Sequence, residues 1–351
     1  MQVAGSVTGE RTPPSPDTMA PPRYTAPFWL PGGNLQTILP ALIGRAPQPP
    51  MVRERWDSLG ADGNPDGDFI DVDWIAGPDG SPRWNPAAPL VVLFHGLEGS
   101  SSSSYARAIM AAVDKRGWNG CVPHFRGCSG EINRLPRAYH SGDSAEIAWI
   151  LERLSARAPA RIHAAGVSLG GNALFKWAAE RGEDAARSVA GIAAVCSPLD
   201  LAACGRALSA GFNMLYTRMF LATLKAKSAR KLERFPGLYD AARLREARDL
   251  YEFDNLVTAP LHGFRDTDDY WARASAKPLL GGIRVPALAL NARNDPFVPA
   301  ASLPHRSAVS RWVLLEQPEH GGHVGFPSAG RRGVAIDWLP DRLIHFFETQ
   351  T

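Results

Sequence analysis

Short apolar runs alternate with longer segments of mixed polarity over most of the chain. The apolar runs are continuous, which is typical of strands buried on both faces of a sheet; they cover residues 90–94, 120–124, 161–167, 191–196, 285–291 and 312–316. Residues 104–116, 142–157 and 336–347 have the pattern of helices. This alternation predicts an α/β fold, with helices on both faces of a mostly parallel central sheet.

A different pattern precedes the first buried run. Residues 53–59 and 68–75 alternate polar and apolar side chains, and the segment 60–67 between them is rich in Gly, Asp and Pro. Alternation with period two on both sides of a turn predicts an antiparallel hairpin. Because every second residue is polar, we expect one face of this hairpin to lie in water.

The strand and helix rhythm stops between residues 198 and 277. This stretch is rich in Ala, Leu, Arg and Lys and contains no convincing buried strand, so we expect a helical cap inserted into the core. Residues 1–23 contain five prolines among small polar residues, which predicts a disordered tail. The expected organisation is a tail at 1–23, a core in two parts at 24–197 and 278–351, and the cap at 198–277.

The composition of the chain bears on which kinds of partner the protein can bind. A net charge of +3 over 351 residues gives no reason to expect a nucleic acid. No apolar run approaches the ~18 residues needed to cross a bilayer, and no secretory signal is visible, so we expect no transmembrane segment. Peripheral contact with a membrane and the oligomeric state stay open. The four cysteines lack metal-ligand spacing, which favours free thiols, no metal, no cofactor and a cytoplasmic protein.

The most informative motif is Gly166-Val167-Ser168-Leu169-Gly170. It ends a predicted buried strand and leads directly into a helical pattern. This is the layout of a nucleophile elbow, in which a sharp strand-to-helix turn lifts one serine hydroxyl above the sheet. Side chains at 166 and 170 would collide with the neighbouring backbone of such a turn. The motif predicts Ser168 as the nucleophile of a hydrolase or an acyltransferase.

A serine nucleophile needs a base that is oriented by a carboxylate, and in this kind of fold the chain order is Ser, then Asp or Glu, then His. Asp295 follows the predicted strand at 285–291, on the sheet edge where such folds bind ligands. We therefore expect Asp295 to be the carboxylate that orients the catalytic histidine. Its rivals lie in the predicted cap: Asp254, Asp266, Asp268 and Asp269.

His323 is the best candidate for the base. It stands between glycines in Gly321-Gly322-His323-Val324-Gly325-Phe326, just after the predicted strand at 312–316. His320 is the closest rival, and His305 is expected to be solvated in a turn. His320 and His323 have half of a metal-binding spacing, but no further Asp, Glu or Cys completes it, so we expect no metal.

The negative oxygen of a tetrahedral intermediate needs two backbone N–H donors. One should be Leu169, directly after the nucleophile. The other should come from the loop after residues 90–94, which reads His95-Gly96-Leu97-Glu98-Gly99, and we expect Leu97 to be that donor. We expect His95 to orient the loop rather than to act in catalysis.

With these parts assembled, the sequence resembles the α/β hydrolases and, more narrowly, the YheT-like family, also called the AB hydrolase 4 family. The resemblance runs from about residue 24 to the end, and its motifs lie at residues 28–30, 34–40, 95–100, 125–131, 139–143, 166–172, 258–264, 294–296 and 321–326. It implies an α/β-hydrolase fold and places the family's charge-relay residues at Ser168, Asp295 and His323. It also implies carboxylic-ester chemistry, because members include carboxylesterases, acylglycerol lipases and ester-forming acyltransferases.

The favoured interpretation is a serine hydrolase that cleaves short-chain esters or acylglycerols through an acyl-enzyme. An acyltransferase with the same triad is the alternative, and a non-catalytic binding protein is a third. We expect the cap to cover an acyl pocket, with Phe212, Met214, Leu215, Met219 and Phe220 as candidate lining residues. Packing of the cap onto the core explains these five side chains equally well.

Overall fold

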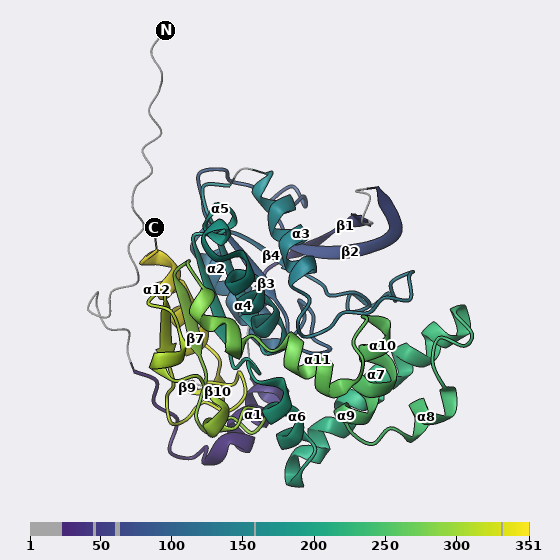
Figure 1. Cartoon of the computed structure of the whole chain (residues 1–351). Helices are drawn as coiled ribbons and strands as arrows, with labels where there is room; N and C mark the ends of the chain where they lie inside the picture. The colour runs from purple at the N-terminus through teal and green to yellow at the C-terminus, as the bar shows by residue number, and fades with distance from the viewer. Residues whose placement is uncertain (1–22, 45–46, 60–63, 158, 331–332, 351) are drawn as a thin grey trace.

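The computed structural model describes residues 23–44, 47–59, 64–157, 159–330 and 333–350. Its centre is an eight-stranded sheet with the order β1-β2-β4-β3-β5-β6-β7-β8 (Figure 1). The strands are β1 (Met51–Leu59), β2 (Pro65–Ile75), β3 (Leu90–Phe94), β4 (Asn119–Pro123), β5 (Ile162–Val167), β6 (Gly191–Val195), β7 (Ala287–Leu290) and β8 (Val313–Glu316). From β4 to β8 every pairing is parallel, whereas β1–β2 and β2–β4 are antiparallel. The predicted α/β fold with an N-terminal hairpin is confirmed.

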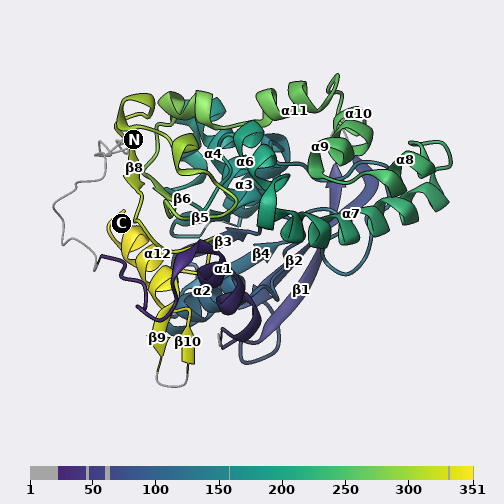
Figure 2. The ribbon, with the colours of Figure 1, turned by 90° about the horizontal axis from the view of Figure 1, so that it is seen from below.

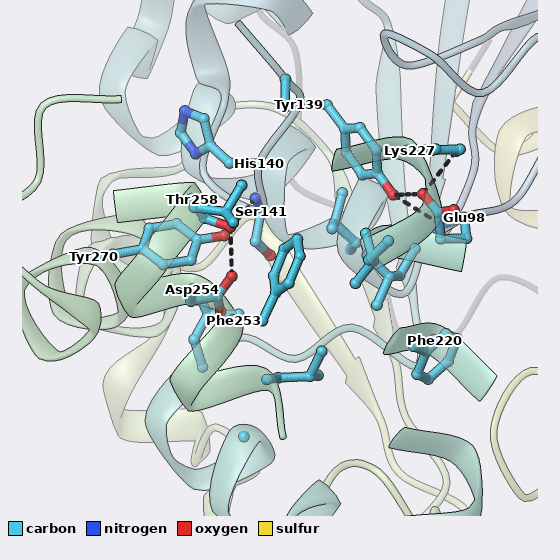
Figure 3. A pocket seen from close by; sticks show the side chains of 18 of the residues that line it. Glu98, Tyr139, His140, Ser141, Phe220, Lys227, Phe253, Asp254, Thr258 and Tyr270 are labelled. Carbon is cyan, nitrogen blue, oxygen red and sulfur yellow. Dashed lines mark hydrogen bonds and ion pairs between the residues drawn. The ribbon is translucent and has the colours of Figure 1, made fainter. Parts of the chain in front are cut away.

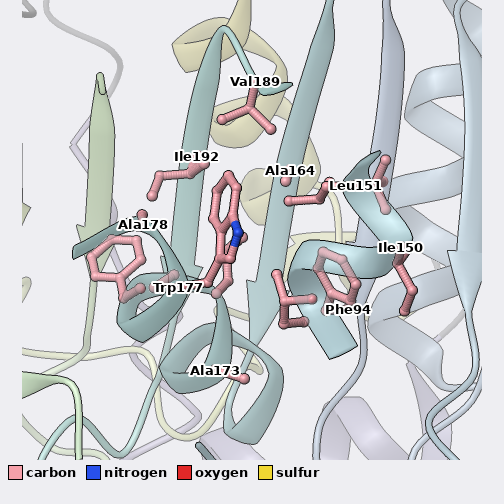
Figure 4. Close-up of a cluster of buried hydrophobic side chains, with 14 of the residues drawn as sticks. Phe94, Ile150, Leu151, Ala164, Ala173, Trp177, Ala178, Val189 and Ile192 are labelled. Atoms are coloured by element: carbon pink, nitrogen blue, oxygen red, sulfur yellow. The ribbon is translucent and has the colours of Figure 1, made fainter. Parts of the chain in front are cut away.

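Helices cover both faces of the sheet. Against one face pack α3 (Ser144–Ser155), α4 (Leu169–Arg181) and the short α5 (Ala185–Ser188); against the other pack α2 (Ser104–Lys115) and α12 (Trp338–Glu348). Side chains of β3 alternate between these two cores, with Val92 on the α4 side and Val91 on the α2 side. On the α4 side, Trp177 lies fully buried between the helices and the strands (Figure 4). This continuous burial explains why the strands have no polar face.

The wet face expected of the hairpin is present on β1, where exposed residues alternate along 53–59, but the expectation is wrong for β2. From Asp68 onward every residue of β2 is buried, including Asp71 and Asp73. Each of these carboxylates is paired: Asp68 with Arg126, Asp71 with Arg55, and Asp73 with Arg53 and His124. Because the polar side chains find charged partners inside the protein, alternation of polarity here does not report exposure.

The segment between β6 and β7 is built from helices. They are α6 (Leu201–Leu208), α7 (Met214–Arg234), α8 (Ala241–Glu246), α9 (Leu250–Phe253), α10 (Ala259–Leu261) and α11 (Thr267–Ala274), with a π-helical turn at Asp254–Thr258. We call α6–α11 the cap helices. Figure 2 shows α7 and α8 extending to one side of the sheet, away from α12. Their own buried cluster includes Leu221, Leu244 and Phe253.

Several elements were not predicted, among them helix α1 (Gly32–Ile43) and a small hairpin near the C-terminus. Helix α1 contains no charged residue and an internal proline, which hides its helical pattern. The small hairpin of β9 (Ser328–Gly330) and β10 (Gly333–Ala335) is too short to give a periodic signal. The tail predicted at 1–23 lies outside the described residues except for Arg23.

Candidate active site

Ser168 sits in a sharp turn between β5 and α4. Its φ of 51° and ψ of −120° are strained for a residue with a side chain. A Cβ atom on Gly170 would lie 2.5 Å from the carbonyl oxygen of Phe94, and one on Gly166 would lie 2.5 Å from that of Gly170. Only glycine fits at both positions, so these two residues let the turn form.

Three side chains from distant parts of the chain meet at the carboxyl ends of the strands. His323 Nε2 lies 3.1 Å from Ser168 Oγ, and His323 Nδ1 lies 2.9 Å from Asp295 Oδ2. The Asp295 side chain is fully buried and the His323 side chain is 11% exposed. A neutral His323 that donates from Nδ1 to Asp295 leaves Nε2 as the acceptor for the serine hydroxyl, which is the arrangement that general-base catalysis requires.

The loop after β7 fixes the Asp295 carboxylate. Its Oδ1 accepts from the backbone N–H groups of Phe297 at 2.8 Å and Val298 at 3.3 Å, which leaves Oδ2 for the histidine. The rival aspartates have other partners: Asp254 accepts from Trp271, Asp266 caps α11, Asp268 accepts from Tyr251, and Asp269 pairs with Arg273. None of these four contacts Ser168 or His323 in the described part of the chain.

The rival histidines lie on the surface. His320 is exposed, with its Nδ1 at 3.4 Å from the side-chain nitrogen of Asn294. His305 is also exposed and contacts Ser307. Only His323 therefore lies within hydrogen-bond distance of Ser168 among the described histidines.

Leu97 and Leu169 were expected to supply the two backbone N–H donors. Both residues line the same cavity as Ser168 and His323. Neighbouring N–H groups of the loop are occupied, since Gly96 donates to Tyr105 and Glu98 donates to Tyr139. In the part of the chain that the structure describes, the N–H groups of Leu97 and Leu169 donate to no protein acceptor. They are free to bind a negative oxygen.

His95 holds the loop that carries Leu97. Its Nε2 accepts from the Phe125 N–H at 3.0 Å, so its Nδ1 is the nitrogen that donates to the Gly96 carbonyl at 2.8 Å. Burial lowers the pKa of His95 to about 3, which keeps the ring neutral at physiological pH. Both nitrogens are used in loop contacts and neither reaches Ser168.

Helix α1 bonds the loops that carry Asp295 and His323, and the sequence analysis assigned this helix no function. Gln36 Oε1 accepts from the Gly321 N–H and from the Asn294 side chain, and Thr37 Oγ1 accepts from the His323 N–H. The signal was present: Gln36 and Thr37 are polar residues in a charge-free helix, inside a motif that carries the family resemblance.

A thiol also lies beside the histidine. Cys196 Sγ accepts from the Val324 N–H at 3.2 Å and lies 3.6 Å from the Gly322 carbonyl. Ligand atoms of Cys196, Asp295 and His323 lie within 4.8 Å of one another, which is a compact enough group to hold a metal ion. Burial raises the pKa of the Cys196 thiol well above its usual value, and its Sγ already contacts the loop of His323.

A cavity of about 160 Å³ lies over these residues, between the core and the cap helices. Much of its lining is apolar, with Leu97, Ile132 and Leu169 from the core and Phe220, Leu224 and Phe253 from the cap helices. Of the five residues expected to line an acyl pocket, only Phe220 does so. Phe212, Leu215 and Met219 are instead 48–63% exposed, because they lie on the outer side of the first turns of α7 or just before it.

Two polar groups lie on opposite sides of the cavity (Figure 3). On one side Glu98 Oε1 accepts from Tyr139 at 2.7 Å and from Lys227 of α7 at 2.8 Å. On the other side Asp254 accepts from Thr258 at 2.6 Å. Burial raises the pKa of Asp254 to about 6. Apolar side chains, with Phe253 among them, separate the two groups.

Comparison with known proteins places this chain in a family. Residues 89–329 match the model of the alpha/beta hydrolase fold family. The chain is 41% identical over 322 residues to the putative esterase YheT of Escherichia coli, covering 88% of this chain and 91% of that protein. It is 29% identical to phospholipase ABHD3 of Homo sapiens, covering 86% and 73% of the two chains. It is 30% identical to a monoacylglycerol lipase of Saccharomyces cerevisiae, covering 75% and 59%.

Solved structures agree at the level of the fold. A bacterial membrane phospholipase A superposes with a TM-score of 0.51 at 15% identity, over 86% of this chain and 87% of that one. Mouse alpha/beta hydrolase domain-containing protein 10 gives a TM-score of 0.50 at 14% identity, over 86% and 99%. Within the described residues, no helix is both long and apolar enough to span a bilayer. The chain belongs to the alpha/beta hydrolase fold family and is YheT-like within it.

Proposed function

We propose that this protein is a serine hydrolase that cleaves carboxylic esters, either short-chain esters or acylglycerols. The observation that carries the proposal is the contact of His323 with both Ser168 and Asp295, at 3.1 and 2.9 Å. Ester hydrolysis in general is supported by the relatives, which include a putative esterase, a phospholipase and a monoacylglycerol lipase. The apolar lining of the cavity suits the acyl chain of such a substrate.

The proposed reaction has two halves. Ser168 Oγ attacks the ester carbonyl while His323 Nε2 takes the hydroxyl proton, and Asp295 stabilises the imidazolium that results. The N–H groups of Leu97 and Leu169 hold the negative oxygen, each contributing about 3 kcal/mol to transition-state stabilisation. His323 then returns its proton to the departing alkoxide, which leaves an acyl group on Ser168. A water molecule deprotonated by His323 releases the acid and restores the serine.

We also propose that the protein is located in the cytoplasm. The four cysteines are buried free thiols, which fits a reducing cytoplasm.

The test is chemical labelling followed by turnover. A fluorophosphonate should label the wild-type protein and not Ser168→Ala, and hydrolysis of a p-nitrophenyl ester series from acetate to palmitate should stop in the same variant. Ser101→Ala is the matched control, because Ser101 bonds Asp73 away from His323 and should keep both activities. Labelling that persists in Ser168→Ala would contradict the proposal. Adding ethanol to the same assay distinguishes hydrolysis from acyl transfer.

A further inference from the structure

The exposed apolar side chains gather in two segments. Eleven large apolar residues are exposed among those described, and eight of them belong either to residues 28–43 or to residues 212–219. Phe28 is 96% exposed and Met219 is 63% exposed. Single exposed apolar residues are ordinary, but eight of eleven in two short segments are a concentrated surface.

The two segments are neighbours in space. Tyr216 of α7 donates its hydroxyl to Asn34 of α1 at 3.0 Å, and Ile38 of α1 packs against the buried cluster that contains Tyr216. The ring of Phe212 lies 5.9 Å from that of Tyr216. We call the six exposed residues of the stretches 28–35 and 212–219 the apolar face: Phe28, Trp29, Leu35, Phe212, Leu215 and Met219.

One exposed basic residue lies within the segments that form the apolar face. Residues 24–44 contain no charged side chain, although α1 lies at the surface. In residues 211–224 the one charged side chain is Arg218, which is exposed; the other basic residues of α7 lie at 225–234, where Lys227 and Lys231 bond groups of the core. Aromatic and aliphatic side chains beside an exposed arginine match the chemistry of a bilayer surface with anionic headgroups.

The apolar face also adjoins the site. The ring of Tyr216 lies 4.6 Å from that of Phe297, and Phe297 lies 4.3 Å from His323. Phe297 lines the cavity, so only two rings separate the exposed Phe212 from the base. A lipid surface held at the apolar face is therefore next to the reaction centre.

We propose that the apolar face docks this protein on anionic lipid surfaces, with Phe28, Phe212 and Met219 inserted among the headgroups and Arg218 facing them. Docking itself is independent of catalysis; that it brings lipophilic esters to Ser168 rests on the proposed function. A second copy of the chain, or a protein partner, is the competing occupant.

The experiment measures binding to vesicles with a protein that cannot turn over lipid. Full-length Ser168→Ala is sedimented with vesicles of phosphatidylcholine plus phosphatidylglycerol, and in parallel with phosphatidylcholine alone. We expect binding to the anionic vesicles and at least about tenfold weaker binding when Phe28→Ser, Phe212→Ser and Met219→Ser are combined. In the Ser168 background these three changes should leave p-nitrophenyl acetate hydrolysis at the wild-type rate, because none of the three residues lines the cavity.

Leu59→Ser with Leu279→Ser is the matched control, since both residues are exposed but lie outside the apolar face. It should bind vesicles as the parent does. Equal binding by the triple variant, or no binding by the parent, would overturn the proposal. So would light scattering that shows a dimeric parent and a monomeric triple variant, because the face would then be a subunit interface. Ester hydrolysis in the Ser168 protein is measured separately, so a failure of docking and a failure of the proposed function give different results.

Discussion

The core side and the cap side of the cavity hold their side chains in different ways. On the core side, Ser168, Cys196 and Val324 all have positive φ values, of 51°, 49° and 65°, in turns that follow strands or glycines. On the cap side, attachment to the core runs through side chains: Lys231 donates to three carbonyls of residues 135–137, and Asn213 donates to the Pro296 carbonyl. Strained backbone turns position Ser168 and its neighbours on the core side, whereas side-chain contacts hold the cap side of the cavity.

The largest effect should come from the core side. Asp295→Asn keeps an acceptor for the Phe297 and Val298 N–H groups but presents an amide N–H to His323 Nδ1, which favours the wrong tautomer. We expect kcat to fall by about 10³–10⁴-fold with little loss of stability. Steady-state kinetics on a p-nitrophenyl ester, with thermal unfolding as the control, measures both. A fall of less than tenfold would show that Asp295 does not orient the base.

A pair of glycines tests the comparison directly. A Cβ on Gly170 meets backbone atoms that cannot move independently, so Gly170→Ala should lower the free energy of unfolding by about 3 kcal/mol and abolish most activity. A Cβ on Gly205 of α6 meets the buried ring of Trp271, which lines the cavity, and meets no backbone atom among its nearest neighbours. Gly205→Ala should cost about 2 kcal/mol through overpacking against this ring and change the preferred acyl chain length instead of kcat on acetate. Urea unfolding and the p-nitrophenyl ester series separate the two outcomes; equal losses in both variants would contradict the distinction.

Lys227 connects the cap side of the cavity to the core side. It pairs with Glu98, the residue that follows the proposed oxyanion donor Leu97 and has a φ of 56°. Lys227→Met should therefore loosen the Leu97 N–H and reduce kcat by about tenfold with a smaller change in KM, because the lost contact positions a transition-state donor.

Lys225→Met is the control on the same helix, since Lys225 donates to the Arg245 carbonyl within the cap helices. It should leave kcat unchanged. Restoration of kcat in Lys227→Arg would support the positioning role, and an effect confined to KM would contradict it.

The smallest effect on turnover is expected at His163 of β5, the strand that precedes the serine, where pH changes stability instead. His163 of β5 is buried, neither ring nitrogen has a partner among the described residues, and burial lowers its pKa to about 4. Between about pH 4 and pH 6.5 the unfolded chain therefore binds a proton at His163 that the folded protein does not bind. Stability from this group is complete above pH 6.5 and declines as the pH falls toward 4, by about 2 kcal/mol between pH 7 and pH 5. Urea unfolding at the two pH values should show a smaller loss for His163→Phe than for the wild type. The exposed control His305→Phe should keep the wild-type slope.

Most of the fold could be predicted because the strands are continuous apolar runs, and that signal depends only on burial. The candidate triad residues could be chosen because each follows a strand end or a glycine-rich turn. The exposed face of the hairpin was predicted correctly for β1 and wrongly for β2, because polarity was equated with exposure, while Asp71 of β2 is buried in a pair with Arg55. The pocket residues on α7 were mostly wrong because composition does not say which side of a helix faces the core. The role of Gln36 depends on contacts across 285 positions, which no local pattern reveals.

The hydrogen bonds from α1 to the loops of Asn294, Gly321 and His323 have a consequence for synthesis. Helix α1 is synthesised before these loops. The groups that donate to its side chains leave the ribosome 258 to 286 residues later. A nascent chain that already carries the turn at Ser168 therefore lacks the histidine proposed as its base. A fragment trimmed to residues 89–329 would contain Ser168, Asp295 and His323 and still lack the helix that keeps the last two in register.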